Sequence, residues 1–308
     1  MKILVTGANG LVGHALMSQP LIGHELIPVF RTQFDLLQWR HVKEIFDVHR
    51  PDAVIHLAAK VGGVKANMAA PATFFMENIT INTHILEAAR LCGVKKLVCF
   101  LSTCIFPDGL EVPLTPQHLH AGPPHHSNYG YAYAKRMLAV QCQSYNEQYG
   151  TNFVPVIPCN IYGPHDNFDL ENGHVVPAMI RKFWEAKIAG QDVTLWGDGG
   201  PLREFIFSDD VARLCLRVLT DYSSTEPLVL SPGLETSVAN LASVVAASMN
   251  FQGRTVYDTS KPSGQYRKPS NNGPLMELWP NFEFTNLVYG INKTVDWFKS
   301  VYPKVRGV

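Results

Sequence analysis

The stretch that decides the fold is Lys2-Ile3-Leu4-Val5-Thr6-Gly7-Ala8-Asn9-Gly10-Leu11-Val12-Gly13. Its first five residues form an apolar run typical of a short buried strand, and a helical pattern follows from residue 14. The glycines have the spacing G-x-x-G-x-x-G, which permits a tight turn and a close approach of the backbone to a pyrophosphate. Amides at the N-terminus of the following helix would point at the negative charge. The stretch therefore predicts the phosphate-binding turn of a dinucleotide-binding sheet.

Strands and helices alternate along the first half of the chain. Apolar runs typical of buried strands and helical patterns follow one another as strand 25–30, helix 39–49, strand 53–57, helix 73–91 and strand 97–101. Regular alternation of this kind is typical of a parallel sheet covered by helices on both faces. We therefore predict an α/β fold in which residues 1–160 form a doubly wound parallel sheet of the Rossmann type.

The pattern changes after about residue 160. Strand-like apolar runs become fewer, proline and glycine become more frequent, and short helical patterns cover 175–189, 208–219 and 237–249. We expect residues 161–308 to form mainly a smaller α/β substrate-binding domain, with part of the chain returning to the Rossmann sheet.

Composition and charge limit the classes of partner. Lys plus Arg and Asp plus Glu number 26 each, so the net charge gives no reason to expect nucleic acid or an anionic membrane as a partner. The six cysteines show no C-x-x-C spacing, which is typical of reduced thiols rather than of a disulfide framework. No apolar run reaches the length of a membrane span, and the chain enters a strand at Lys2 with no leader pattern. We therefore expect a cytoplasmic protein.

Residues 102–135 contain the groups that could carry out chemistry. Ser102 and Cys104 follow an apolar run, so they lie just past the carboxyl end of a predicted strand, where ligands bind in open α/β sheets. Tyr131 and Lys135 are four residues apart in a helical pattern and share one helix face, a spacing that also occurs on ordinary surface helices. The Lys135 cation would favour ionisation of the Tyr131 phenol. A serine, a tyrosine and a lysine that converge on one carbonyl oxygen can polarise it and supply a proton during hydride transfer.

The end of the second predicted strand indicates the choice of cofactor. Arg31 follows this strand at the position where an acidic residue would bind the ribose hydroxyl of NAD, whereas arginine suits the 2′-phosphate of NADP. The alternative is a solvated arginine at a strand end. Asp35 would lie near the adenine. We therefore expect NADP (NADPH) as the cofactor.

The motifs together resemble the extended short-chain dehydrogenase/reductase family, whose members act mostly on nucleotide sugars. The generic part of the resemblance consists of the glycine turn, Ser102 and Tyr131-x-x-x-Lys135. Four longer motifs are more specific, and they lie at 56–63, 102–107, 160–168 and 201–205. These motifs resemble the branch of the family that converts GDP-4-keto-6-deoxy-D-mannose into GDP-L-fucose, and the resemblance covers nearly the whole chain.

The resemblance implies epimerisation at C3 and C5 of the sugar, followed by reduction at C4. It assigns Cys104 and His174 to the base and the acid that invert the two centres, whose protons are acidic because they lie beside a carbonyl. A base role for Cys104 requires a thiolate stabilised by positive charge, such as that of Lys135, the nicotinamide or His174. Tyr131 would then protonate O4 during hydride transfer from NADPH, and Ser102 would hold the same oxygen.

The resemblance also implies contacts with the cofactor and with a GDP-sugar substrate. The expected cofactor contacts are Gly7, Asn9, Gly10, Leu11, Val12, Gly13, Arg31, Asp35, Leu57, Ala58, Ala59, Lys135, Pro158, Asn160, Ile161 and His174. The GDP group needs cations for its diphosphate and apolar or aromatic surface for its base. The expected substrate contacts are Val175, Met179, Lys182, Leu195, Trp196, Arg203 and Lys268. Residues 260–268 resemble a loop that closes over the substrate.

Other interpretations of these motifs stay open. A nucleotide-sugar 4-epimerase or 4,6-dehydratase would keep NAD(P) as a recycled cofactor, although a dehydratase favours Glu where Cys104 stands. A non-catalytic NADP-sensing protein would share the fold, but such proteins commonly lack the Tyr131 and Lys135 pair. The histidines at 118, 120, 125 and 126 have no matching ligand pair elsewhere, so we expect no metal.

The oligomeric state is expected to be a homodimer, formed through the helices that begin near residues 73 and 131. Phe75, Ile79, Leu86 and Ala89 form one stripe of the first of these helices. We expect this stripe to pack against the sheet or against the partner subunit.

Overall fold

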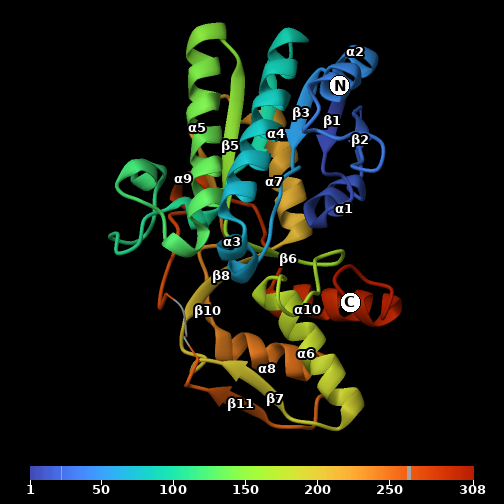
Figure 1. Cartoon of the computed structure of the whole chain (residues 1–308), viewed down its shortest axis with the longest axis vertical. Coiled ribbons are helices and arrows are strands. Elements are labelled where there is room, and N and C mark those ends of the chain that lie inside the picture. Colours follow the sequence, from blue (N-terminus) through green and yellow to red (C-terminus); the bar gives the residue numbers. More distant parts are fainter. Residues whose placement is uncertain (22, 262–264) are drawn as a thin grey trace.

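The computed structural model describes residues 1–21, 23–261 and 265–308, so positions 262–264 of the expected substrate loop lie outside the described residues. A six-stranded sheet dominates the first half (Figure 1). Its strands are β1 (Lys2–Thr6), β2 (Glu25–Val29), β3 (Ala53–His56), β4 (Lys96–Phe100), β5 (Asn152–Pro158) and β9 (Leu228–Leu230). They follow the order β2-β1-β3-β4-β5-β9, and all neighbours are parallel, so the predicted doubly wound parallel sheet is confirmed.

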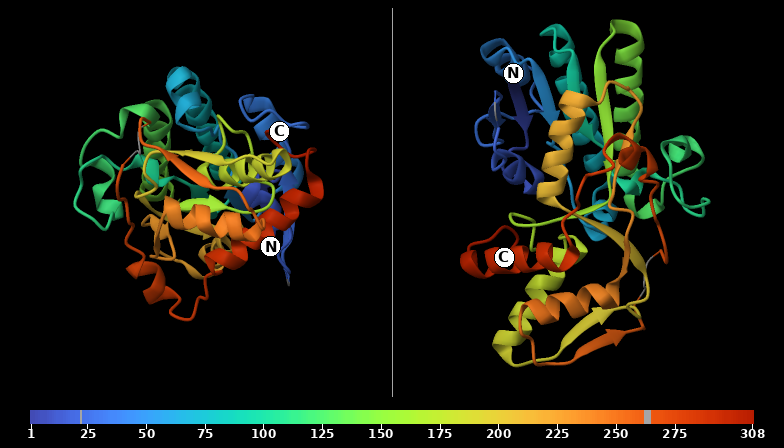
Figure 2. Two further views of the ribbon diagram at one scale, coloured as in Figure 1. Left: turned by 90° about the horizontal axis from the view of Figure 1, so that it is seen from below. Right: turned by 180° about the vertical axis from the view of Figure 1, so that it is seen from behind.

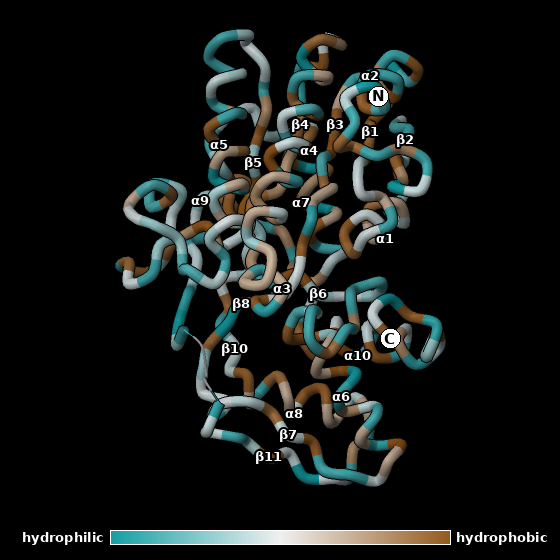
Figure 3. Tube along the Cα trace, viewed as in Figure 1, coloured by the Kyte–Doolittle hydropathy of each residue, from teal (hydrophilic) through white to brown (hydrophobic). Residues whose placement is uncertain are grey.

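Helices cover both faces of this sheet because its strands alternate their apolar side chains between the two faces (Figure 2). Ile3 and Val5 point to one face, where they share a core with helices α1 (Leu11–Met17), α7 (Ser208–Asp221) and α9 (Gly273–Leu278). Leu4 points to the other face, which is covered by α2 (Trp39–His49), α4 (Pro71–Leu91) and α5 (Tyr129–Tyr149). Hydrophobic residues accordingly gather along the central strands of the sheet (Figure 3).

The stripe predicted for α4 divides between the core and the surface. Leu86 and Ala89 are buried in the core, but Phe75 is 39% exposed. The buried face of the helix instead carries Asn78 and Asn82, both fully buried. Their amides are used in hydrogen bonds to the ends of neighbouring strands, and sequence periodicity does not reveal this because it counts apolar residues.

A second group of elements has its own apolar core, formed mainly by three helices and short strands. The helices are α6 (Val175–Ala189), α8 (Val238–Ser248) and α10 (Leu287–Val301). The strands are β6 (Asn160–Tyr162), β7 (Val193–Trp196), β8 (Leu202–Phe207), β10 (Glu235–Ser237) and β11 (Thr255–Asp258), which pair in the orders β10-β8-β6 and β11-β7. Figure 1 shows this group beyond the carboxyl ends of the strands of the large sheet.

The chain passes between the two groups more than once. After β8 it enters α7 and β9, which lie on the large sheet, and it then returns through β10 to the second group. Residues near 270 return once more, because Leu114 pairs with Ser270 and its amide donates to the carbonyl of Pro269 at 2.8 Å. Among the described residues, no helix is long and apolar enough to cross a bilayer.

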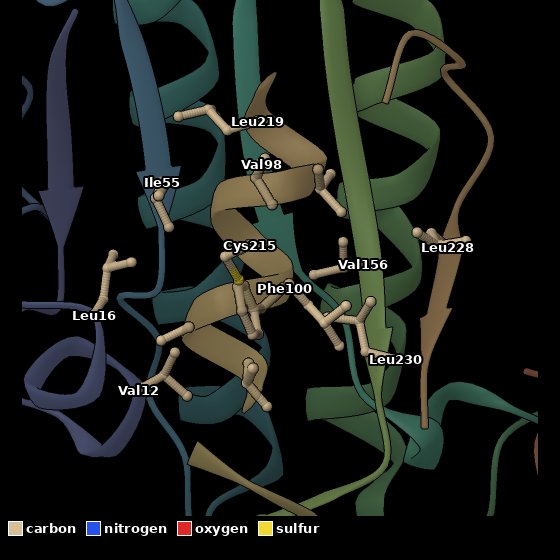
Figure 4. Packing of buried hydrophobic residues seen from close by; sticks show 14 of the residues in the cluster. Val12, Leu16, Ile55, Val98, Phe100, Val156, Cys215, Leu219, Leu228 and Leu230 are labelled. Carbon is tan, nitrogen blue, oxygen red and sulfur yellow. The ribbon is translucent and has the colours of Figure 1, made fainter. Parts of the chain in front are cut away.

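The return of β9 to the sheet provides a test of the fold. Leu230 is fully buried beside Val156 and Phe100 (Figure 4), whereas Leu234 is 71% exposed four residues later. Leu230→Ala should lower the free energy of unfolding by about 2–5 kcal/mol, since it leaves a cavity in the core. Leu234→Ala is the matched control and should change it by less than about 0.5 kcal/mol. Equal losses in urea denaturation would contradict the assigned position of β9.

Candidate active site

The glycine turn lies at the carboxyl ends of β1 and β3, where the strand order reverses. Gly7 has φ of +71°, and a Cβ there would lie 2.9 Å from the amide nitrogen of Ala58. A Cβ on Gly13 would lie 2.5 Å from the carbonyl oxygens of Gly7 and Ala8. Only glycine fits at these two positions, because the turn packs closely against the segment after β3 and against its own carbonyl groups at the start of α1. This cradle fits the pyrophosphate of a dinucleotide.

A buried network holds the turn against β3, and sequence reasoning missed it. His56 lies between Thr6 and Asn82, with Nδ1 2.7 Å from the Thr6 hydroxyl and Nε2 3.1 Å from the Asn82 carbonyl oxygen. The Thr6 hydroxyl also accepts the Ala58 N–H at 3.2 Å. Burial lowers the pKa of His56 to about 3, so the ring stays neutral and its role is structural. In the sequence, the sign of this network is a histidine within an otherwise apolar strand.

The segment after β2 contains the two residues expected near the adenine end of the cofactor. Arg31 is exposed and makes no ion pair with any described residue. Asp35 has its carboxylate turned toward its own chain, where it accepts the Leu37 N–H at 3.1 Å. Arg31 is thus free to meet a phosphate, while Asp35 stabilises the local turn.

The segments after β3 and β5 lie at the same edge of the sheet. Leu57, Ala58 and Ala59 are half-buried directly after β3. Pro158 is the buried last residue of β5, and the side-chain amide of Asn160 donates to the carbonyl of Glu204 at 2.8 Å. Small or backbone-engaged residues therefore border the region next to the glycine turn.

Ser102 and Cys104 follow β4 in a short 3-10 helix, η1 (Thr103–Ile105). Ser102 caps this helix, and its hydroxyl oxygen accepts the Cys104 N–H at 3.4 Å. Burial raises the pKa of the Cys104 thiol, while the Ser102 hydroxyl and the charges of Lys268 and Lys135 oppose that increase. The proximity of Lys268 to Cys104 was not predicted, because the sequence analysis assigned Lys268 only to the phosphates of the substrate.

Tyr131 and Lys135 lie one turn apart on α5, as expected. The Lys135 ammonium is 5.8 Å from the centre of the Tyr131 ring and donates to the carbonyl of Phe100 at 2.7 Å. Burial opposes the expected effect of Lys135 on Tyr131, because it raises the pKa of the phenol well above its usual value. Burial also lowers the pKa of Lys135 to about 8, so its side chain holds its proton less tightly than an exposed lysine does. Tyr131 is therefore protonated at neutral pH.

His174 comes from the second group of elements, at the N-terminus of α6. Its loop is joined to the edge of the large sheet, because Gly63 donates its N–H to the carbonyl of Asn172 at 2.9 Å. Desolvation and the charge of Arg306 both lower the pKa of His174. The positive charges that act on Cys104 are those of Lys268 and Lys135, so Lys135 is the one of the expected stabilising groups whose charge acts on the thiol.

The expected substrate residues separate into two sets. Lys268 and Arg203 lie near each other and near Cys104, because the charge of Arg203 lowers the pKa of Lys268 and that of Cys104 raises it. Lys182 lies elsewhere, in a depression on α6 beside Gln191 and Asp192. Trp196 is 64% exposed at the end of β7. Met179 and Leu195 are buried in the core of the second group, while Val175 is 38% exposed at the start of α6.

The histidines at 118–126 have local structural contacts. His118 caps the 3-10 helix η2 (Pro116–His120), where its ring accepts the Thr115 N–H at 3.2 Å. The Nδ1 atom of His125 lies 2.7 Å from the hydroxyl oxygen of Ser127, which belongs to the 3-10 helix η3 (His126–Asn128). The Nε2 atom of His125 lies 3.6 Å from the carboxylate of Asp108. In the described part of the chain no group of three or more His, Cys, Asp or Glu side chains could hold a metal ion.

Comparisons with known proteins agree with this architecture. The model of the NAD dependent epimerase/dehydratase family matches residues 3–230. A GDP-L-fucose synthase from Dictyostelium discoideum is 42% identical and aligns with 99% of this chain and 97% of its own. A solved GDP-L-fucose synthetase from Naegleria fowleri bound to NADP has a TM-score of 0.95 and 41% identity, covering 99% of this chain and 94% of that one. The GDP-L-fucose synthase of Escherichia coli is 35% identical over 99% of both chains. The chain therefore belongs to the NAD dependent epimerase/dehydratase family, in its group of GDP-L-fucose synthases.

Proposed function

We propose that this protein converts GDP-4-keto-6-deoxy-D-mannose into GDP-L-fucose with NADPH as the reductant. The observation that carries the proposal is that a hydroxyl, a thiol, a phenol and an ammonium gather at the end of β4, at the edge of the sheet that also carries the glycine turn; they come from Ser102, Cys104, Tyr131 and Lys135. The first two follow β4 and the other two lie on α5, which packs against that strand. Membership of the family supports the same reaction.

The cofactor is held along the carboxyl edge of β1, β2 and β3. The glycine turn of residues 7–13 would hold the pyrophosphate, and Arg31 would hold the 2′-phosphate that distinguishes NADP from NAD. Leu57, Ala58 and Ala59 on one side and Pro158, Asn160 and Ile161 on the other border the nicotinamide half. When bound, NADPH supplies a hydride to C4 of the sugar.

Reduction at C4 requires a proton for the carbonyl oxygen. Tyr131 supplies it, and the raised pKa of its buried phenol keeps that proton in place until the oxygen becomes basic. Ser102 donates a second hydrogen bond to the same oxygen and polarises the carbonyl. Lys135 holds its position through the carbonyl of Phe100 and stabilises the phenolate left behind.

Inversion at C3 and C5 requires a base on one face of the sugar and an acid on the other. Cys104 is the base, and the nearby charges of Lys268 and Lys135 favour its thiolate form. His174 is the acid, delivered by the loop that Gly63 joins to the sheet. The 4-keto group makes both steps possible, because the carbanion formed at C3 or C5 delocalises onto the carbonyl oxygen.

The GDP group binds across the second group of elements. Arg203 and Lys268 face its diphosphate, and their lowered pKa values show that both cations are desolvated. Trp196 and Val175 offer exposed apolar surface to the base, while Met179 is buried one turn after Val175 and Lys182 lies further along α6.

We also propose a domain organisation, an oligomeric state and a cellular location. Residues 1–160 form the NADP-binding domain, and residues 161–308 form mainly the substrate-binding domain with a return to the large sheet. Two copies associate through α4 and α5, whose outer surfaces expose Phe75, Met76 and Tyr129. The protein is cytoplasmic, which suits its six free thiols.

The reaction itself can be tested by stoichiometry. Purified protein given GDP-4-keto-6-deoxy-D-mannose should oxidise one NADPH for each GDP-L-fucose formed, as followed by absorbance and by NMR of the sugar. A recycled-cofactor epimerase or dehydratase would instead retain NAD(P) and consume no added NADPH. If the protein binds NADPH but does not convert the sugar, the proposed catalytic function is wrong.

Two variants should separate the two kinds of chemistry. Cys104→Ser should abolish deuterium uptake from D2O at C3 and C5, because a serine hydroxyl is too weak a base. Tyr131→Phe should keep that uptake and slow NADPH oxidation by more than about tenfold, since it removes the proton donor. Unchanged deuterium uptake in the first variant would exclude Cys104 as the base.

Cofactor preference depends on one exposed cation. Arg31→Ala should raise the KM for NADPH by about tenfold or more while the KM for NADH stays within a factor of about two, because only NADPH carries the 2′-phosphate. Arg254→Ala is the control, since that arginine is 85% exposed and pairs with Asp192 in the second group. A parallel rise for both cofactors would show that Arg31 does not read the phosphate.

A further inference from the structure

Residues 303–308 pack against the loop that presents His174, and the reaction described above gives them no role. The amide of Phe168 donates to the carbonyl of Arg306 at 2.9 Å. Arg181 on α6 bridges the two segments, because its Nη1 donates to the carbonyl of Phe168 at 3.3 Å and to that of Gly307 at 2.5 Å. The two segments are therefore joined by a backbone hydrogen bond and by an arginine that bonds to a carbonyl group of each.

Gly307 fits against this loop without room for a side chain. Its φ is +90°, and a Cβ there would lie 2.3 Å from both the Asn167 Oδ1 atom and the Asp169 amide nitrogen. Even the smallest substitution at Gly307 must therefore displace residues 167–169. The tight fit indicates that the two segments are built as one unit.

The loop can pass such a displacement on to His174. The Asp169 carboxylate accepts the amides of Glu171 at 2.9 Å and Asn172 at 2.6 Å, and the Asp169 carbonyl accepts the amide of Gly173 at 2.9 Å. Phe168 is fully buried, with its ring centre 4.6 Å from that of Phe298 on α10. Residues 168–173 are thus a compact turn, and a shift at its start moves its end.

Charge connects the same two segments. Arg306 is close enough to Asp166 and His174 to lower the pKa of each, although burial dominates at Asp166 and raises its pKa to about 7. Glu171 of this loop pairs instead with Lys65 of helix α3 (Val64–Ala69) at 2.7 Å. Arg306 therefore adds a charge interaction to the backbone contacts between the two segments.

We propose that residues 303–308 are a positioning element of the active site, which fixes the loop 167–174 so that His174 meets the sugar face opposite Cys104. The inference rests on the proposed function, because it takes His174 as the acid. Arg181 and Gly307 set the position of the loop.

Two glycine variants test the positioning. Gly307→Ala and Gly190→Ala both place an alanine at positive φ, but the Cβ at position 190 meets nothing within 4 Å. Deuterium enters the sugar whenever Cys104 removes a proton and returns a deuteron, whereas inversion also needs His174 on the other face. Gly307→Ala should lower the number of inversions per deuterium incorporated by about tenfold or more, because a misplaced acid loses its geometry. Gly190→Ala should keep the ratio of the unaltered protein.

A general loss of stability would lower exchange and inversion together, so an unchanged ratio in Gly307→Ala would overturn the proposal. Far-ultraviolet circular dichroism and NADPH binding verify that each variant is folded. If Gly307→Ala does not fold, Arg181→Met decides the question by the same ratio. In the unaltered protein, absence of both exchange and NADPH oxidation would instead reject the proposed function.

Discussion

Two consecutive basic residues of α5 hold the reactive end of β4 in place, and the rest of the site depends on them. Lys135 donates to the carbonyl of Phe100 at 2.7 Å, and Arg136 donates to that of Ile105 at 2.6 Å. The hydroxyl and the thiol of Ser102 and Cys104 lie between these two anchors. Both cations are buried, and charged donors to carbonyl oxygens make stronger hydrogen bonds than neutral ones. The helix that carries Tyr131 is thereby fixed relative to the strand end it must serve.

Burial of these groups decides their protonation more than the charges between them do. A lysine beside a tyrosine lowers the phenol pKa in water, but here burial raises the pKa of Tyr131 and lowers that of Lys135 to about 8. The Cys104 thiol follows the same rule, with Lys268 as the largest opposing charge. Tyr131 therefore rests with its proton in place, which suits a reaction that ends by protonating an oxygen, whereas Cys104 must first lose its proton to act as the proposed base.

Local patterns predicted the parts of this site that lie within one element. The glycine turn, the strand ends and the Tyr131 and Lys135 spacing are short-range features, because each follows from strand or helix geometry alone. The contacts that the sequence did not indicate are all long-range: His56 with Asn82, Arg136 with Ile105, and Lys268 with Cys104. Polar residues on buried helix faces and basic residues near strand ends carry no periodic signal, and only the fold shows which backbone groups they reach.

The site separates the groups that fix the backbone from the groups that are free to react. Arg136, Arg181 and the Asp169 carboxylate bond to main-chain atoms, and so does the Lys135 ammonium. In the part of the chain that the structure describes, the Tyr131 hydroxyl and the His174 ring make no hydrogen bond with protein atoms. Charged side chains that fix the backbone remove its freedom before a ligand arrives, so less of the binding energy is lost in ordering the site. In the proposed mechanism a sugar with two inversion centres and one carbonyl needs this arrangement, because the proposed acid and base come from different parts of the fold and must both reach one ring.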